Sequence, residues 1–181
     1  YDSRGNRTQS VDALNHETRY VYDGMSRLTS TLRDLDGDGA DGDGTDIVTT
    51  QTWDDPSRLT SQGDDSGNNT RYAYDALNRL IVTQMADGTI DQVGSGAVWT
   101  LGNPSPNLGG FTSGYDVYDN KQSTRDANGS VVTSVYDLLN RVTSVSIVRA
   151  AGVLGSTSES YQYDGLSRLV RAEDNDSLVT R

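Results

Sequence analysis

The sequence predicts an all-β protein built from tandem β-hairpins, and three observations support this fold class. An aromatic residue followed by Asp recurs along the 181 residues. Before these pairs, side chains alternate with a period of two, the pattern of a strand with two distinct faces. Short runs rich in Gly, Asn, Ser and Pro follow them, as expected for tight turns. No segment keeps the helical period over three turns, so we expect strands and turns throughout.

The aromatic–Asp pairs define an internal repeat. They begin at Tyr1, Tyr22, Trp53, Tyr74, Tyr118, Tyr136 and Tyr163. The steps between them are 21, 31, 21, 44, 18 and 27 residues, so the basic unit is near 21 residues and 44 is close to two units. Helical repeats have similar periods, and the strand-like alternation therefore decides the class.

The first part of the chain contains two predicted hairpins separated by an acidic insertion. A strand that ends at Tyr22 is followed by a turn and by a second strand at 27–30. This strand–turn–strand pattern indicates a β-hairpin. Residues 34–46 form the acidic insertion, and the next hairpin turns within 53–61 (WDDPSRLTS).

Later hairpins follow the same pattern. The word RYAYDALNRLIV at 71–82 returns as YDLLNRVTSV at 136–145 and as YQYDGLSRLVR at 161–171. Turn signals at 64–68 and 126–129 separate neighbouring hairpins.

The repeated residues are suited to building a hairpin. Tyr72 and Tyr74 lie on one face of a strand, where cross-strand aromatic pairs contribute roughly 0.2–1 kcal/mol each. Asp75 opens the turn, and its carboxylate is expected to cap backbone N–H groups. Arg79 closes the turn within reach of an aspartate or a tyrosine ring. We therefore interpret the motif as architecture and assign no catalytic residue and no organic cofactor site to it.

Composition limits the function classes. The net charge is −11, which disfavours binding to nucleic acid or to an anionic membrane surface. The absence of cysteine excludes disulfides, thiol nucleophiles and zinc–thiolate sites. No apolar run is long enough for membrane insertion, and no signal peptide opens the sequence. Because the chain opens within the repeated word, we expect it to be part of a longer polypeptide whose export signal lies upstream.

The words YDSRGNRT, YDGMSRLTS, YDALNRL and YDLLNRVTSV resemble the YD repeats, or RHS repeats, of bacterial polymorphic toxins, Tc-toxin cocoons and teneurins. This resemblance implies a single repeat array over 1–181 whose hairpins form a curved or spiralling antiparallel sheet. In that family the sheet encloses a hollow shell, often around a toxin, and the repeat is scaffold.

Two departures from the family pattern lead to further expectations. The pair Tyr118-Asp119 has no arginine at the expected place and is followed by the short step of 18, which predicts a degenerate hairpin. The family's shells often close with an Asp-Pro-x-Gly cleavage segment. The sole Asp-Pro here, Asp55-Pro56, continues as Ser-Arg within an ordinary turn, so neither cleavage segment nor effector is expected.

The acidic insertion has the composition of a calcium loop. Its first part fits D-x-D-x-D-G, and calcium prefers six to eight oxygen ligands. The expected structural calcium ligands are Asp34, Asp36, Asp38, Asp41, Asp43 and Asp46. Thr45 stands where an EF-hand has a bidentate Glu, so the segment is closer to the compact Asp/Gly loops of extracellular bacterial proteins. The competing interpretation is a solvated acidic loop that protects a strand edge.

Two other features of the sequence are candidates for function. His16 is the single histidine and lies in a predicted turn, so a surface role is preferred to general-base catalysis. Residues 91–117 break the repeat rhythm and form a predicted irregular insertion. Its aromatic residues, Trp99, Phe111 and Tyr115, are candidates for stacking on a sugar or packing against a neighbouring subunit. The alternative is that Trp99 simply covers the apolar layer.

These observations predict a structural, non-enzymatic segment of a secreted bacterial protein, located outside the cell or at its surface. The expected role is to form the wall of a shell or of a self-associating assembly, with further repeats of a parent chain or copies of itself as partners. The alternative is a recognition or adhesion module that binds glycan or a cell-surface protein through 91–117.

Overall fold

The computed structural model describes residues 1–37, 45–95, 112–175 and 177–180. These residues form two compact units. Unit 1 comprises Tyr1–Tyr72 with Gln84–Gly88, and unit 2 comprises Ala73–Thr83 with Thr89–Arg181. The described residues contain strands and turns, and no helix long and apolar enough to cross a membrane was found among them. The predicted all-β class is confirmed.

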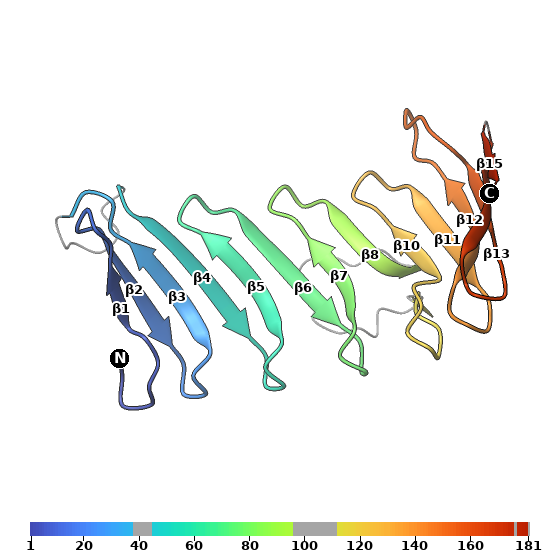
Figure 1. The fold of residues 1–181 in the computed structure, drawn as a ribbon. Coiled ribbons are helices and arrows are strands. Elements are labelled where there is room, and N and C mark those ends of the chain that lie inside the picture. Colours follow the sequence, from blue (N-terminus) through green and yellow to red (C-terminus); the bar gives the residue numbers. More distant parts are fainter. Residues whose placement is uncertain (38–44, 96–111, 176, 181) are drawn as a thin grey trace. The chain divides into compact units, whose positions relative to one another are not determined.

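Unit 1 is an antiparallel sheet in which strands adjacent in sequence are adjacent in space. The strands are β1 (Gln9–Val11), β2 (Glu17–Tyr22), β3 (Leu28–Arg33), β4 (Ile47–Trp53), β5 (Leu59–Asp64) and the first part of β6 (Asn69–Tyr74). In Figure 1 the turns from β2 to β3 and from β4 to β5 lie at the same edge of this unit. The predicted hairpin meander is therefore observed directly.

Unit 2 continues the same design. Its strands are β7 (Leu80–Gln84), β8 (Ile90–Ser95), β9 (Thr112–Ser113), β10 (Ser123–Arg125), β11 (Val131–Tyr136), β12 (Val142–Val148), β13 (Ser158–Tyr163), β14 (Leu169–Asp174) and β15 (Leu178–Thr180). The order is β7-β8-β10-β11-β12-β13-β14-β15, and β9 pairs with β8 beside this path. All of the described pairings from β8 onward are antiparallel.

The core is small because each unit is mainly a sheet of hairpins. Among the described residues, the buried apolar side chains are Ile81 and Val82 of β7. Ala73, Ile90 and Tyr115 pack against them and are partly buried. A sheet with so little buried apolar surface depends strongly on hydrogen bonds and on contacts between neighbouring hairpins.

The segment predicted as an irregular insertion is partly regular. Residues 91–95 belong to β8, and Thr112–Ser113 form β9. Gly114 follows at a point where three backbones meet: a Cβ placed there would lie 2.2 Å from the carbonyl oxygen of Ser123 and 2.7 Å from the nitrogen of Gly94. This contact needs a residue without a side chain, which is the physical reason for glycine here. Residues 96–111, including Trp99 and Phe111, lie outside the described residues.

Candidate functional site

The repeated motif forms a turn that is organised by its aspartate. In the turn that begins at Asp75, Oδ1 of this residue accepts hydrogen bonds from the backbone N–H groups of Leu77 and Arg79, both at 2.9 Å. The N–H of Asp75 donates to the carbonyl of Arg79, and the N–H of Asn78 donates to the carbonyl of Asp75. Asn78 has a φ of 63°, so the turn combines a type I turn with one left-handed residue. The predicted cap is confirmed.

We use the name YD turn for each five-residue turn of this kind in which an aromatic residue directly precedes the aspartate. The YD turns begin at Asp2, Asp23, Asp54, Asp75, Asp116, Asp137 and Asp164. The left-handed residue is the third after the aspartate: Gly5, Ser26, Ser57, Asn78, Asp119, Asn140 and Ser167. Short side chains at this position reduce the steric penalty of a positive φ.

The residue that ends a YD turn completes the cap. In five turns it is arginine, and its Nε donates to Oδ2 of the aspartate at 2.6–2.8 Å. In two turns it is asparagine, and the side-chain amides of Asn6 and Asn120 donate to Asp2 and Asp116 at 2.8 Å. Either residue therefore satisfies the second carboxylate oxygen.

In five of the YD turns, the aromatic residue before the aspartate bonds to the preceding hairpin. Its ring O–H or N–H donates to the backbone carbonyl of the residue directly after the preceding YD turn. The described pairs are Tyr22 with Arg7 (3.1 Å), Trp53 with Leu28 (2.8 Å), Tyr115 with Leu80 (2.9 Å), Tyr136 with Lys121 (3.0 Å) and Tyr163 with Val142 (2.9 Å). Tryptophan replaces tyrosine at Trp53 because its Nε1–H makes the same donation.

Successive YD turns are also joined directly to one another. The side chain that ends one turn donates to the side chain of the left-handed residue in the next. These turn-to-turn links are Asn6 to Ser26 (3.1 Å), Arg27 to Ser57 (3.3 Å), Arg79 to Asp119 (2.8 Å), Asn120 to Asn140 (3.0 Å) and Arg141 to Ser167 (3.1 Å). The motif thus builds a hairpin and fastens it to the next hairpin.

Arginine also stacks on the aromatic ring of the next hairpin. The guanidinium carbon of Arg79 lies 4.5 Å from the centre of the Tyr115 ring, and that of Arg141 lies 4.6 Å from the centre of the Tyr163 ring. Both distances suit a cation–π contact. The prediction that Arg79 reaches an aspartate and a tyrosine ring is confirmed.

The expected register of the fifth aromatic–Asp pair was wrong. Asp116, not Asp119, caps the turn, because the N–H groups of Tyr118 and Asn120 donate to its Oδ1 at 2.8 and 2.9 Å. Asp119 is the left-handed residue of the same turn, with a φ of 65°. The aromatic partner is therefore Tyr115, and the next step along the sequence, to Tyr136, is 21 residues. This hairpin is not degenerate: Asn120 takes the place of arginine, as Asn6 does in the first turn.

Tyr115 consequently does not serve as an exposed stacking platform. Its hydroxyl donates to the carbonyl of Leu80, and its ring lies under the Arg79 guanidinium. Burial raises the pKa of the Tyr115 hydroxyl above its ordinary value, and the nearby Arg79 charge acts in the opposite direction. The residue belongs to the links between hairpins.

His16 occupies a related turn. Oδ1 of Asp12 accepts the N–H groups of Leu14 and His16 at 2.8 and 2.9 Å, and Nδ1 of His16 lies 3.0 Å from Oδ2 of Asp12. The imidazole therefore stands where an arginine stands in a YD turn. This placement agrees with the turn role expected from the sequence.

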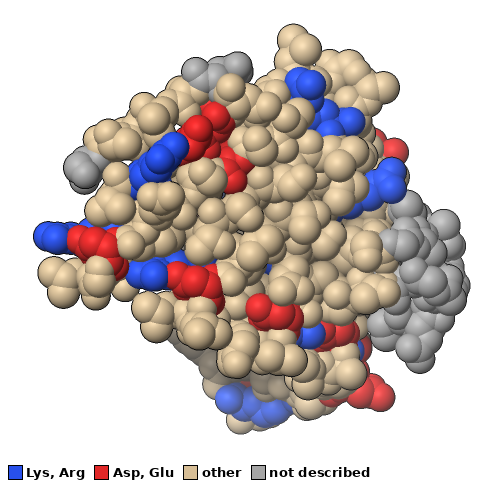
Figure 2. Space-filling model, turned by 90° about the vertical axis from the view of Figure 1, so that its right-hand side faces the viewer, with Lys and Arg blue, Asp and Glu red and all other residues tan. Residues whose placement is uncertain are grey.

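The electrostatics of the YD turns follow from these bonds. The side-chain hydrogen bond from Arg141 lowers the pKa of Asp137 below its ordinary value, burial opposes this, and the backbone N–H of Arg141 adds to the lowering. In the next turn, the backbone N–H of Arg168 is the largest cause of the lowered pKa of Asp164. On the face in Figure 2, Lys or Arg side chains lie beside Asp or Glu side chains at several places, and other residue types make up most of the surface.

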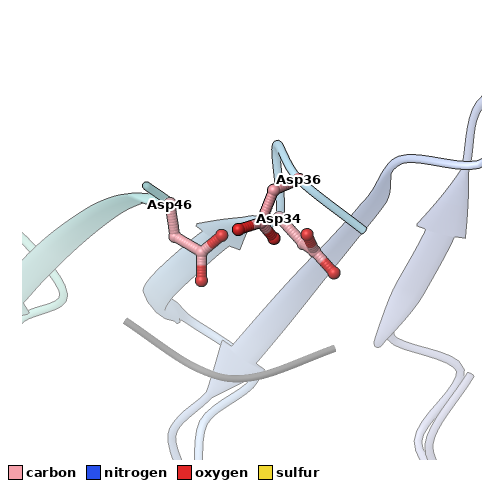
Figure 3. A group of neighbouring side chains, drawn as sticks. All are labelled: Asp34, Asp36 and Asp46. Carbon is pink, nitrogen blue, oxygen red and sulfur yellow. The ribbon is translucent and has the colours of Figure 1, made fainter. Parts of the chain in front are cut away.

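Three of the six predicted calcium ligands come together. Asp34, Asp36 and Asp46 each place a carboxylate oxygen within 4.8 Å of the others, and Figure 3 shows the three groups facing one another. Asp34 and Asp46 are only 3% and 6% exposed. Asp38, Asp41 and Asp43 lie outside the described residues.

Short-range bonds fix this carboxylate group at the junction of β3 and β4. Oδ1 of Asp34 accepts the N–H of Gly37 at 2.6 Å, and the hydroxyl of Thr45 donates to Asp36 at 2.8 Å. Oδ1 of Asp46 accepts the N–H of Leu35 at 3.4 Å. The ends of the insertion are therefore held close together by the segment's own residues.

Comparison with known proteins identifies the repeat. Residues 1–38 and 53–90 match the profile of the family described as RHS Repeat. The search of curated proteins returned no match. These two segments are RHS repeats, and the same turn geometry recurs at Asp116, Asp137 and Asp164.

Solved structures share the fold. The crystal structure of TcdB2-TccC3-TEV is similar with a TM-score of 0.61 and 18% identity, and that of TcdB2-TccC3 with 0.60 and 17%. The Tc holotoxin pore of Photorhabdus luminescens gives a TM-score of 0.60 and 17% identity. In each case the match covers 88% of this chain and 8% of the other chain. The chain thus spans a small part of the length of these Tc toxin chains and has the fold of that part.

Proposed function

We propose that the chain is a structural, non-enzymatic wall segment of an extracellular bacterial assembly of the toxin-shell type. The observation on which this rests is the set of turn-to-turn links. The bonds that carry the proposal run from the end of a YD turn, or from the aromatic residue before it, to the neighbouring hairpin. Residues used in this way extend a sheet, and the likeness to Tc toxin chains favours a shell as the assembled form.

Further hairpins or further copies are the proposed partners. β1 and β15 are the end strands of the described order, and the outer edge of such a strand is ready to pair with additional strands. Their side chains Val11 and Val179 are 54% and 61% exposed. Lysine on an edge strand blocks this pairing. Val11→Lys with Val179→Lys should therefore abolish end-to-end association.

The test is sedimentation velocity over a concentration series, combined with electron microscopy. The unmodified chain should form ribbons one sheet thick, and the double variant should not. Val135→Lys, on the interior strand β11 and also exposed, is the matched control and should still assemble. A chain that never forms ribbons, or ribbons that persist in the double variant, would count against the wall function.

The competing recognition function has less support. Of the three aromatic residues on which it depends, Tyr115 is engaged between hairpins. Glycan-array binding that disappears with Trp99→Ala would favour recognition over the wall.

We also propose that the acidic insertion binds calcium as a structural ion, through Asp34, Asp36 and Asp46 together with Asp38, Asp41 and Asp43. The support is the convergence of three carboxylates at the junction of β3 and β4. An ion there would neutralise like charges and fix how two hairpins meet. A dissociation constant tenfold below the ambient calcium concentration stabilises the fold by roughly 1.4 kcal/mol.

Calorimetric titration and thermal melting test this proposal. Calcium should raise the melting temperature and excess chelator should lower it. Asp46→Asn should weaken binding, whereas Asp55→Asn, an exposed aspartate in a YD turn, should leave it unchanged. Identical melting curves with no heat of binding would leave the solvated-loop interpretation.

A further inference from the structure

The YD turns of unit 2 expose a row of large apolar side chains. These side chains stand at the first or second position after the capping aspartates and form what we call the turn row: Leu77, Val117, Tyr118, Leu138, Leu139 and Leu166. All are at least 66% exposed, and Leu138 reaches 97%. Because all of these turns lie at the same edge of an antiparallel sheet, the row follows one edge of the unit. Exposed apolar groups concentrated on one edge indicate an interaction surface.

The turns that carry the turn row are evenly spaced and bonded to one another. Consecutive YD turns are separated by two strand spacings, about 10 Å. The links from Arg79 to Asp119, from Asn120 to Asn140 and from Arg141 to Ser167 fix each turn to the next. The row therefore repeats at the spacing of the turns, which the same row of a second copy would match.

Charge on this edge is self-complementary. Within the turns, the carboxylates of Asp75 and Asp137 are paired with arginine and have little exposure. Asp119 and Arg168 are also paired within the chain, with Arg79 and Asp164, but each keeps 73% of its side chain exposed and can make a further contact. They belong to the turns on either side of the one that begins at Asp137. A twofold axis through that central turn would place Asp119 of one copy opposite Arg168 of the other, twice.

We propose that the turn row is a docking surface for the turn row of a second copy of this chain. The twofold axis passes near Leu138 and Leu139, so these residues meet their own counterparts, while Tyr118 packs near Leu166 of the second copy. Such an isologous contact is distinct from strand pairing at β1 and β15. It joins sheets side by side, whereas the strand edges join them end to end.

The opposite edge of unit 2 does not offer the same surface. Its turns at 126–130 and 174–177 are built from Asp, Ala, Asn, Gly and Ser. Leu154 lies at that edge and is 90% exposed, which makes it a matched control for the leucines of the turn row.

Disulfide trapping is the direct test, because the chain has no cysteine. Leu139→Cys should form a cross-linked dimer rapidly under mild oxidation, and Leu154→Cys should not. A cross-link that appears only when these two variants are mixed would place the turn row against the opposite edge and overturn the proposal. Equal cross-linking of both variants with themselves would also overturn it.

Sedimentation equilibrium supplies a second measurement in the background of Val11→Lys with Val179→Lys, which removes strand-edge pairing. The dimer dissociation constant should rise about tenfold or more with Leu139→Gln and remain unchanged with Leu154→Gln. Asp119→Asn and Arg168→Gln should each raise it several-fold, and the double variant no more than either alone. A chain that stays monomeric in this background, or one whose affinity is insensitive to Leu139→Gln, would contradict the proposal, whatever the outcome for the wall function.

Discussion

At the scale of single residues, the arginine that ends a YD turn has two roles, one inside its turn and one outside. Arg141 donates through Nε to Asp137 at 2.7 Å and through Nη1 to Ser167 at 3.1 Å, and it lies over the ring of Tyr163. Arg168 makes the equivalent bond to Asp164 but is mostly exposed. Substituting Arg168 removes the bond that caps its turn, whereas substituting Arg141 removes a cap and also the link to the next turn. Comparing the two losses of stability therefore separates the contribution of the cap from that of the link.

Replacing Arg141 tests this separation. Arg141→Met removes the hydrogen bonds to Asp137 and Ser167 together with the ring contact, and should lower the free energy of unfolding by about 1–3 kcal/mol. Arg141→Lys should recover little of this, because an ammonium group cannot reach both acceptors. Arg168→Met is the control and should cost less. Chemical denaturation measures all three, and equal losses for Arg141→Met and Arg168→Met would show that the link contributes nothing.

A second residue-scale prediction concerns Gly114. Gly114→Ala would place a methyl group 2.2 Å from the Ser123 carbonyl oxygen, so backbone must move and the unfolding free energy should fall by about 2 kcal/mol or more. Gly165→Ala is the matched control: a Cβ there meets nothing within 4 Å. Thermal melting should show a clear loss for the first variant and almost none for the second. Comparable melting temperatures would mean that the backbones do not meet closely at Gly114.

At the scale of elements, the YD turn is the unit that responds to pH. The pKa of Asp137 is lowered in the folded chain, so its stabilising contribution is present above the unfolded value, near 3.9, and is lost as pH falls through the folded value. The destabilising effect of Asp137→Asn on the melting temperature should therefore be present at pH 7 and shrink below about pH 4. The control, Asp55→Asn, should lower the melting temperature at pH 7 by less than Asp137→Asn does. A loss of melting temperature in Asp137→Asn that is the same at every pH would contradict the lowered pKa of Asp137.

The elements were largely predictable from the sequence, whereas the contacts between them were not. The alternation of side chains located the strands that end at Tyr22 and Tyr74. Asp75 caps its turn and Arg79 pairs with it, as their residue types predicted. The register at Tyr115 was missed because two Tyr-Asp words stand three residues apart. The 21-residue step to Tyr136 and an Asn at the arginine position, as in the first turn, were the signals that distinguish them.

The turn-to-turn links had no comparable signal in the sequence. They depend on the left-handed residue of the next turn, which is a serine in some turns and asparagine or aspartate in others. The side chain of this left-handed residue reaches the arginine of the preceding turn only because successive turns lie next to each other in the folded sheet. In the acidic insertion, the pattern predicted six ligands, and the structure brings together Asp34, Asp36 and Asp46, whose burial could not be read from composition.

At the scale of the whole molecule, stability depends on the same bonds between hairpins that the proposed wall function uses. Each unit buries little apolar surface, and hairpins are held by bonds that run from one repeat to the next. Such a chain should behave as a linear array in which loss of one link weakens the two hairpins that it joins. Amide hydrogen exchange resolves this at the level of single strands.

Hydrogen exchange of the unmodified chain and of Arg141→Met is therefore the most direct test of the central claim, that linked YD turns make the wall. We expect faster exchange in both hairpins joined at Arg141, β11–β12 and β13–β14, with strands β2–β5 of unit 1 unchanged. Arg168→Met should leave β11–β12 protected. Faster exchange confined to the turn that contains Arg141, or no change in β13–β14, would contradict the account.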